Sequence, residues 1–407
     1  MTKELLQDNG SSWKKKIVIF LISQNISLFG SSVVSFAIIW HITLLTSSGK
    51  WVMLFTICSL LPQVLISLWA GVWADRYNRK YLIMLADGFI ALATFSLVIA
   101  MWAGYENLEL LLLIALARSL GAGIQTPAVG ALFPQIVPVD KLTRVQGINQ
   151  TLNSVLMLLS PAVGGLVLGF KGIVWAFMLD VLTASLAIAV LSLLKVEKVA
   201  RPEGKTSVLT ELRQGVAYAF NNKLLRLILI CFGISFILIT PAAVLTPLLV
   251  ERSFGSDVWR LTANEMVWTV GSLLGGVFVS FKGSFHNKIR TVALCLVAFG
   301  VTFGLLGIAQ NFVFYLLIMG ISGFFMPIVA TAQTVLLQEN VEAVMMGRVF
   351  SLVQIVTGSA MPIAILFFGP LADIIPIGVI LVVTGFLLAL TGFWYQISSK
   401  RAGLIEN

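Results

Sequence analysis

The sequence predicts an all-α polytopic membrane protein with twelve transmembrane helices in two pseudo-symmetric six-helix bundles. Hydrophobic residues make up 58% of the chain and charged residues only 11%, whereas soluble domains carry about 25% charged residues. Charged and polar clusters divide the chain into twelve apolar runs. Most of these runs exceed the roughly 20 residues that a helix needs to cross a bilayer. Glycines and prolines also recur at matching places in the two halves.

The expected spans follow one another with short connections. They lie close to residues 17–45, 51–74, 81–104, 110–133, 145–170, 172–194, 224–250, 258–281, 291–309, 312–337, 347–371 and 374–397. The first run is too long for the apolar part of a signal peptide and lacks a small-residue cleavage site, so we expect it to remain as a membrane helix. Pro241 and Pro247 predict a break in the seventh run, because proline interrupts helical hydrogen bonding.

The positive residues are distributed unequally over the connections. Of 27 Lys and Arg residues, 22 lie on the side of the N-terminus, four lie on the other side and Arg118 lies within a span. Positive loops stay in the cytoplasm, so both termini are expected on the cytoplasmic side of the cell membrane. The same distribution accounts for the net charge of +9 through membrane topology, and no nucleic-acid partner is expected.

The longest polar stretch divides the chain into bundles 1–194 and 224–407, with a cytoplasmic linker at 195–223. Apolar residues at helical spacing within Val208–Phe220 suggest an amphipathic helix on the inner membrane surface, and a partly ordered linker is the alternative. The pairs that indicate the repeat are Gly71 and Gly271, Pro127 and Pro327, Gly147 and Gly347, and Pro161 and Pro362. A parallel repeat of this kind places a binding site near the bilayer midplane.

The connection after the second span, Gly71–Lys80, reads GVWADRYNRK. Its glycine, acid and following cations resemble the loop signature of major facilitator superfamily transporters. Asn78 stands where that family usually has a second glycine, and Asn also tolerates a left-handed turn. The resemblance implies a gating latch made of Gly71, Asp75, Arg76, Arg79 and Lys80. Asp75 would be attracted to the positive start of the eleventh span.

Arg118 lies inside the fourth span, in the sequence RSLGAG that ends at Gly123. A guanidinium in a bilayer costs at least about 2.5–3.5 kcal/mol, so Arg118 is expected to face a cavity or a partner. The pattern resembles a motif that the family associates with proton transfer, in which the arginine modulates a neighbouring acid. A structural ion pair is the alternative role.

Three acids lie within spans, namely Asp87, Asp180 and Glu265. An intramembrane carboxyl is a candidate proton site by default. The family's fold places the third and sixth helices at the periphery, which leaves structural roles open for Asp87 and Asp180. Glu265, one turn before Trp268, is therefore the preferred cavity acid. Pairing of Glu265 with Arg252 or Arg260 is the competing interpretation.

The fifth span carries Pro161, Gly164 and Gly165 in the sequence SPAVGG. This resembles a family motif of antiporters, in which a proline kink lies beside a smooth glycine face that allows close helix packing. Polar and adaptable apolar side chains elsewhere are expected to line a cavity. They are Gln24, Asn25, Gln125, Asn153, Phe236, Trp268, Met326, Gln333 and Gln354.

Further stretches at 133–142, 146–150 and 346–352 resemble the macrolide-efflux branch of the superfamily. The resemblance implies a proton-driven exporter of amphipathic compounds with lipid, substrate and protons as partners. The alternatives are a carrier of a native metabolite, siderophore or peptide, and a non-transporting sensor or assembly partner. No enzyme motif, metal site or cofactor site is found. We expect a monomer, with a separate ATPase subunit left open.

Overall fold

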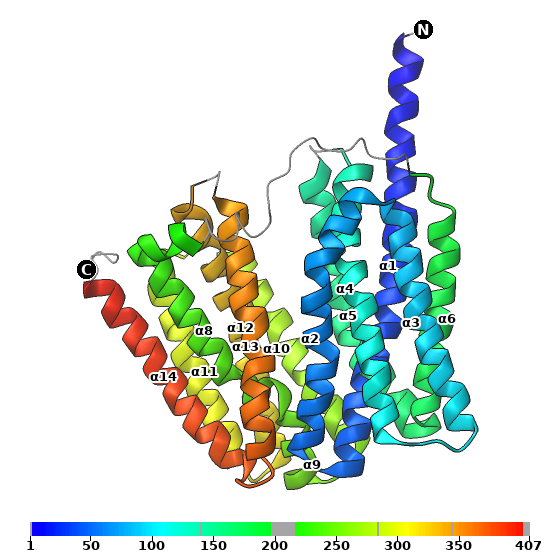
Figure 1. Ribbon diagram of the computed structural model, residues 1–407. Coiled ribbons are helices and arrows are strands. Elements are labelled where there is room, and N and C mark those ends of the chain that lie inside the picture. Colours follow the sequence, from blue (N-terminus) through cyan, green and yellow to red (C-terminus); the bar gives the residue numbers. More distant parts are fainter. Residues whose placement is uncertain (1, 139–140, 197–215, 283–284, 343–344, 402–407) are drawn as a thin grey trace. The chain divides into compact units, whose positions relative to one another are not determined.

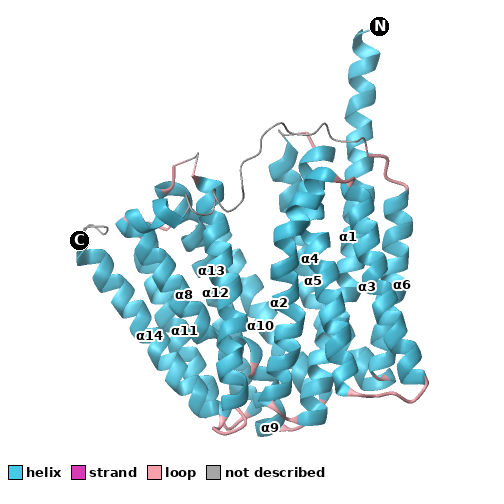
Figure 2. Ribbon diagram, in the orientation of Figure 1, coloured by secondary structure: helices cyan, strands magenta, loops and turns pink. Residues whose placement is uncertain are grey.

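The computed structural model describes residues 2–138, 141–196, 216–282, 285–342 and 345–401. These residues form helices joined by short turns and include no strand (Figure 2). By its internal contacts, the chain forms two compact units. The first comprises residues 1–45 and 54–202, and the second comprises residues 46–53 and 203–407.

The first unit is built from six long helices (Figure 1). They are α1 (Thr2–Thr46), α2 (Gly49–Arg76), α3 (Arg79–Trp102), α4 (Leu108–Ile136), α5 (Leu142–Lys171) and α6 (Ile173–Ser192). Asn78 does not adopt the left-handed turn that its residue type would tolerate, because its φ is −68°. Its side chain instead accepts a hydrogen bond from the backbone N–H of Lys80 and caps the start of α3.

The second unit continues with helices of similar length. They are α8 (Lys223–Val244), α9 (Thr246–Phe254), α10 (Val258–Lys282), α11 (Lys288–Ile308), α12 (Phe312–Asn340), α13 (Met346–Leu371) and α14 (Ile377–Arg401). The predicted break in the seventh span is present, since α8 ends before Leu245 and Pro247 lies in the first turn of α9. Most of the predicted amphipathic helix lies outside the described residues, and residues 216–221 are helical.

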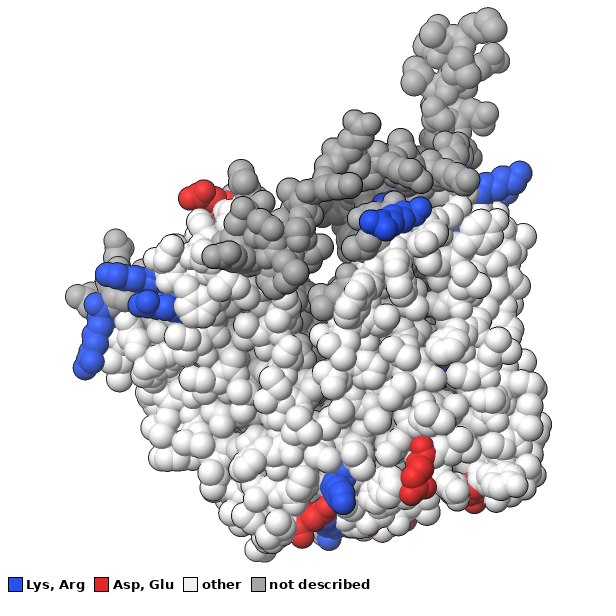
Figure 3. Space-filling view, in the orientation of Figure 1, with Lys and Arg blue, Asp and Glu red and all other residues white. Residues whose placement is uncertain are grey.

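The helices have the length and composition of a multi-pass membrane protein. Eleven of the described spans, with α8 and α9 taken together, are long and apolar enough to cross a membrane. Helix α10 matches the eighth expected span in position but is not among the eleven. On the face shown in Figure 3, charged side chains lie near the two ends of the helices, and the band between them is almost free of charge. The predicted fold class is confirmed.

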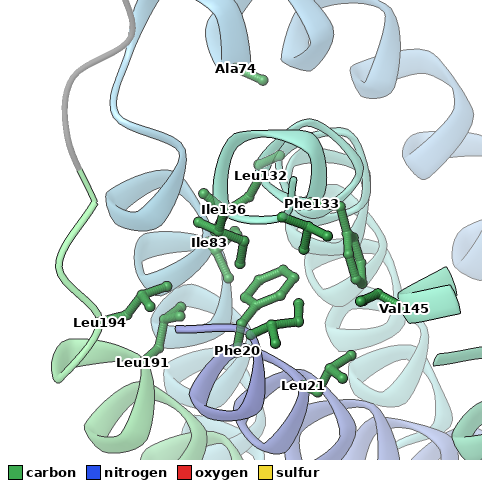
Figure 4. Close-up of a cluster of buried hydrophobic side chains, with 13 residues drawn as sticks. Phe20, Leu21, Ala74, Ile83, Leu132, Phe133, Ile136, Val145, Leu191 and Leu194 are labelled. Carbon is green, nitrogen blue, oxygen red and sulfur yellow. The ribbon is translucent and has the colours of Figure 1, made fainter. Parts of the chain in front are cut away.

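A cluster of buried hydrophobic side chains holds one end of the first unit together (Figure 4). It takes Phe20 from α1, Ala74 from α2, Ile83 from α3, Leu132 and Phe133 from α4, Val145 from α5 and Leu191 from α6. The rings of Phe20 and Phe133 meet edge to face at 5.0 Å between centroids, an arrangement worth about 0.5–1.5 kcal/mol beyond the burial of area. The two helices that flank the turn between α2 and α3 are therefore both packed in this cluster.

In the second unit, α11 packs on α14 through glycines that let the backbones approach. A methyl group at Gly300 would overlap the carbonyl oxygen of Gly385, whereas a methyl group at Gly304 would meet nothing. Helix association in membranes depends on such close packing of small residues, because lipid is as apolar as the side chains.

This packing predicts opposite effects for two neighbouring substitutions. Gly300→Ala is expected to lower the stability of the protein by about 1–3 kcal/mol, because the added methyl group forces α11 away from α14. Gly304→Ala is the matched control and is expected to leave stability unchanged or to raise it slightly. Unfolding temperatures of the purified variants in detergent would test this. Equal temperatures for the two would contradict the close packing.

Candidate functional site

The interior of the first unit contains a buried ion pair. Arg118 of α4 is 9% exposed and Asp180 of α6 is fully buried, and the guanidinium donates to the carboxylate. Thr94 of α3 bonds to both members of the pair, donating to Asp180 Oδ2 at 3.2 Å. Ser31 of α1 donates to Asp180 Oδ1 at 3.1 Å. Four helices thus contribute side chains to one intramembrane ion pair and its hydrogen bonds, which is how such charges are tolerated in a bilayer.

Asp87 of α3 is a second buried carboxyl in the same unit, and it differs from Asp180 in having no cationic partner among the described residues. Its side chain is 2% exposed. Ser27 Oγ at 2.9 Å and Gln125 Nε2 at 2.6 Å both donate to Asp87 Oδ1. Asp87 Oδ2 is buried and has no hydrogen-bond partner among the described residues. A lone carboxylate in an apolar interior is costly, and binding a proton there removes the charge and supplies a donor.

Three serines of α1 donate hydrogen bonds to neighbouring helices, and two of them contact the two acids. Ser23, Ser27 and Ser31 recur every fourth residue, so they lie on one face of the helix. Ser23 donates to the carbonyl oxygen of Ala187 at 2.9 Å, Ser27 donates to Asp87 and Ser31 donates to Asp180. Helix α1 therefore contacts both carboxyl groups directly. Sequence analysis missed these serines, although their four-residue spacing is visible in the sequence.

Glu265, the acid that the sequence favours, lies in the second unit on α10. Its carboxylate is half-buried and accepts from Asn264 Nδ2 at 3.3 Å, and buried Asn264 accepts from the Tyr315 hydroxyl at 2.9 Å. The alternative pairings of Glu265 are not formed. Arg260 forms a salt bridge with Asp257 at 3.0 Å, and Arg252 forms a salt bridge with Asp373 at 2.9 Å.

Two cations of the predicted gating segment, Arg79 and Lys80, donate hydrogen bonds to backbone carbonyl oxygens of the first unit. Arg79 donates to the carbonyl oxygens of Ala74 and Ala131, each at 3.0 Å, and Lys80 donates to the carbonyl oxygen of Ser192 at 2.7 Å. Arg76 is exposed, and a methyl group at Gly71 would meet nothing. The side chains of Asp75 and Arg348 lie outside those that the structure describes. The proposed attraction of Asp75 to the eleventh span therefore remains a prediction.

The small-residue face of α5 lies against α1. Pro161, Gly164 and Gly165 are buried, and a methyl group at Gly164 would lie 3.4 Å from the carbonyl oxygen of Val33 on α1. A methyl group would therefore make ordinary van der Waals contact there, and α5 lies next to the helix that carries the serine row without requiring glycine at position 164. This contact places the glycine motif of α5 next to α1, the helix whose serines donate hydrogen bonds to Asp87 and Asp180.

The expected cavity residues are only partly brought together. Gln125 contacts Asp87, and Gln24 Nε2 and Asn25 Oδ1 are buried without a partner among the described residues. Of the others, Met326 and Gln354 are exposed, and the half-buried residues are Asn153, Phe236, Trp268 and Gln333. A cavity of about 440 Å³ lies between α10 and α12, is lined by apolar residues and includes none of this set.

Comparison with known proteins identifies the family. Residues 20–365 match the Major Facilitator Superfamily, and the chain belongs to this superfamily. It is 27% identical over 367 residues to macrolide efflux protein A of Streptococcus pyogenes, covering 89% of this chain and 91% of the relative. It is 25% identical to the enterobactin exporter EntS of Escherichia coli, covering 79% of this chain and 78% of the relative.

Solved structures agree with this fold at low sequence identity. A bacterial homologue of the iron transporter ferroportin in an inward-facing state superposes with a TM-score of 0.73 at 15% identity, covering 95% of this chain and 99% of that one. A POT family transporter in complex with 5-aminolevulinic acid superposes with a TM-score of 0.75 at 12% identity, covering 95% and 96%. These structures bear on the fold alone.

Proposed function

We propose that this transporter is a secondary active exporter of amphipathic small molecules that works by proton antiport. The observation that carries the proposal is Asp87, a membrane-embedded carboxyl with one fully buried oxygen that has no hydrogen-bond partner in the part of the chain that the structure describes. Ionisable residues inside membrane segments are costly and are retained for function, most often on ion or proton pathways. Asp87 lies in the same bundle as the Arg118–Asp180 pair, to which α1 connects it.

The two acids take different roles in this proposal. Arg118 pairs with Asp180, and the pair serves as a fixed structural element of the bundle. Asp87 alternates between a protonated state and a state in which substrate binding is favoured. Ser27 and Gln125 hold Asp87 Oδ1 in place and leave Oδ2 to receive the proton. Because Ser27 belongs to α1, a change in the charge of Asp87 acts directly on the packing of that helix.

The relatives support export and suggest a substrate class. The matches to macrolide efflux protein A and to the enterobactin exporter favour a large amphipathic substrate that leaves the cell. We take a macrolide-like drug or another xenobiotic as the first candidate. A native siderophore-like metabolite is the second candidate, and the match to the enterobactin exporter favours it.

Transport into inside-out membrane vesicles tests the function. Vesicles with the protein are expected to accumulate a macrolide or a fluorescent amphipathic dye when their interior is made acidic, and an uncoupler is expected to stop this. Vesicles without the protein are the control. Accumulation driven by a sodium gradient but not by a proton gradient would overturn proton coupling. Accumulation of catecholate siderophores but of no drug would establish the second candidate.

A further inference from the structure

Residues 46–53 form the junction of α1 and α2, and they group with the second unit although the chain before and after them belongs to the first. The carboxylate of Asp373, which follows α13, caps the start of α2. It accepts from the backbone N–H groups of Gly49 at 2.7 Å and Lys50 at 2.9 Å and from the Ser48 hydroxyl at 2.8 Å. The first N–H groups of a helix have no hydrogen-bond partner within that helix. In α2, the carboxylate of a residue distant in the sequence accepts hydrogen bonds from two of these groups.

Arg252 and Glu251 of α9 complete this contact. Arg252 Nη2 lies 2.9 Å from Asp373 Oδ1, and the same guanidinium donates to the carbonyl oxygens of Ser47 and Ala372. The Ser47 hydroxyl donates to Glu251 Oε2 at 2.6 Å. These hydrogen bonds connect residues 47–50 to α9 and to the end of α13. We call Glu251, Arg252 and Asp373 the clamp.

Two further observations indicate that the clamp holds the junction in a particular conformation. Ser47 has a φ of 45°, the only positive φ of a non-glycine residue among those described. Such a backbone costs about 1–3 kcal/mol and persists only where its surroundings impose it. Gly49 lies against the carbonyl oxygen of Gly369, and a methyl group at Gly369 would overlap Met53. Partial burial acts to raise the pKa of Asp373, but its hydrogen bonds outweigh this and lower the pKa, so the cap is ionised.

We propose that the clamp is a gate contact that opens reversibly. In each transport cycle, Asp373 and Arg252 must break their hydrogen bonds to residues 46–53. The contact is suited to release because both charged side chains are 29% exposed, so water can replace the bonds that are broken. Exposed charge pairs are worth little in isolation. The strained Ser47 relaxes when the contact opens, which lowers the cost of release. The inference rests on the proposed function only in assuming a transport cycle.

The test measures release directly and needs no substrate. Met53 is 8% exposed and is placed to report on the junction. In purified Met53→Cys protein in detergent, labelling by a maleimide is expected to be slow. The parent protein, with native Cys58, Cys231 and Cys295, gives the background. Asp373→Asn is expected to raise the labelling rate about tenfold, because it removes a charge-assisted cap and one member of an ion pair.

Two further variants make the result decisive. Asp257→Asn removes another acid of the same unit that pairs with an arginine outside the clamp, and it is expected to leave labelling unchanged. Arg252→Gln is expected to act like Asp373→Asn if the clamp works as a unit. Fast labelling in both clamp variants at normal unfolding temperatures supports the proposal. Unchanged labelling in both folded variants overturns it, whether or not a transported substrate is found.

Discussion

Replacing Asp87 by Asn is expected to abolish proton-driven accumulation while leaving downhill movement of substrate intact. Asparagine has nearly the shape of aspartate and can still accept from Ser27 and Gln125, so the fold is expected to survive. It cannot bind and release a proton. A gradient of one pH unit supports about tenfold accumulation for each proton exchanged. In Asp87→Asn vesicles this ratio is expected to fall to about one, that is, to equal concentrations on both sides.

Glu265→Gln is the matched comparison, because it neutralises the acid that the sequence alone favours. Glu265 already accepts a bond from Asn264 and lies in the other unit, so we expect this variant to keep proton-driven accumulation. Measuring both variants at equal protein levels separates two hypotheses. If Glu265→Gln loses coupling and Asp87→Asn retains it, the proton site lies on α10 and the assignment to Asp87 is wrong.

Most of the fold could be predicted because a bilayer imposes simple rules on sequence. Length and hydropathy placed every described helix within a few residues of its expected span, apart from the extension of α1 to Thr2. Pro241 and Pro247 indicated the break in the seventh span because proline acts locally. The role of Asn78 could not be predicted, because Asn serves both left-handed turns and helix caps, and only the backbone distinguishes the two.

The polar site was predicted less completely because its partners are distant in sequence. Arg118 and Asp180 can each be recognised from the sequence as a charge within a span, but their pairing depends on how α4 and α6 pack. The preference for Glu265 over Asp87 came from the family's helix order, which says nothing about hydrogen-bond partners. The cap on α2 joins residues 325 positions apart, Ser48 and Asp373. No local pattern marks it in the sequence.

Replacing Arg118 by Ala is expected to destabilise the protein by about 3–5 kcal/mol, because it leaves the carboxylate of Asp180 buried without its counter-ion. Asp180 is fully buried, and the hydroxyl groups of Thr94 and Ser31 cannot neutralise it. The expected result is a large loss of folded protein from the membrane and a lower unfolding temperature in detergent. Normal yield and stability of Arg118→Ala would show that Asp180 does not depend on the pair.

The double variant Arg118→Leu with Asp180→Leu separates folding from function. Removing both charges restores an apolar interior, and such replacements of buried ion pairs are often neutral or stabilising. We therefore expect the double variant to recover most of the stability that Arg118→Ala loses. Its transport then decides the role of the pair. Proton-driven accumulation in the folded double variant would make the pair structural, whereas its loss would show that the fixed charges take part in coupling to Asp87 through α1.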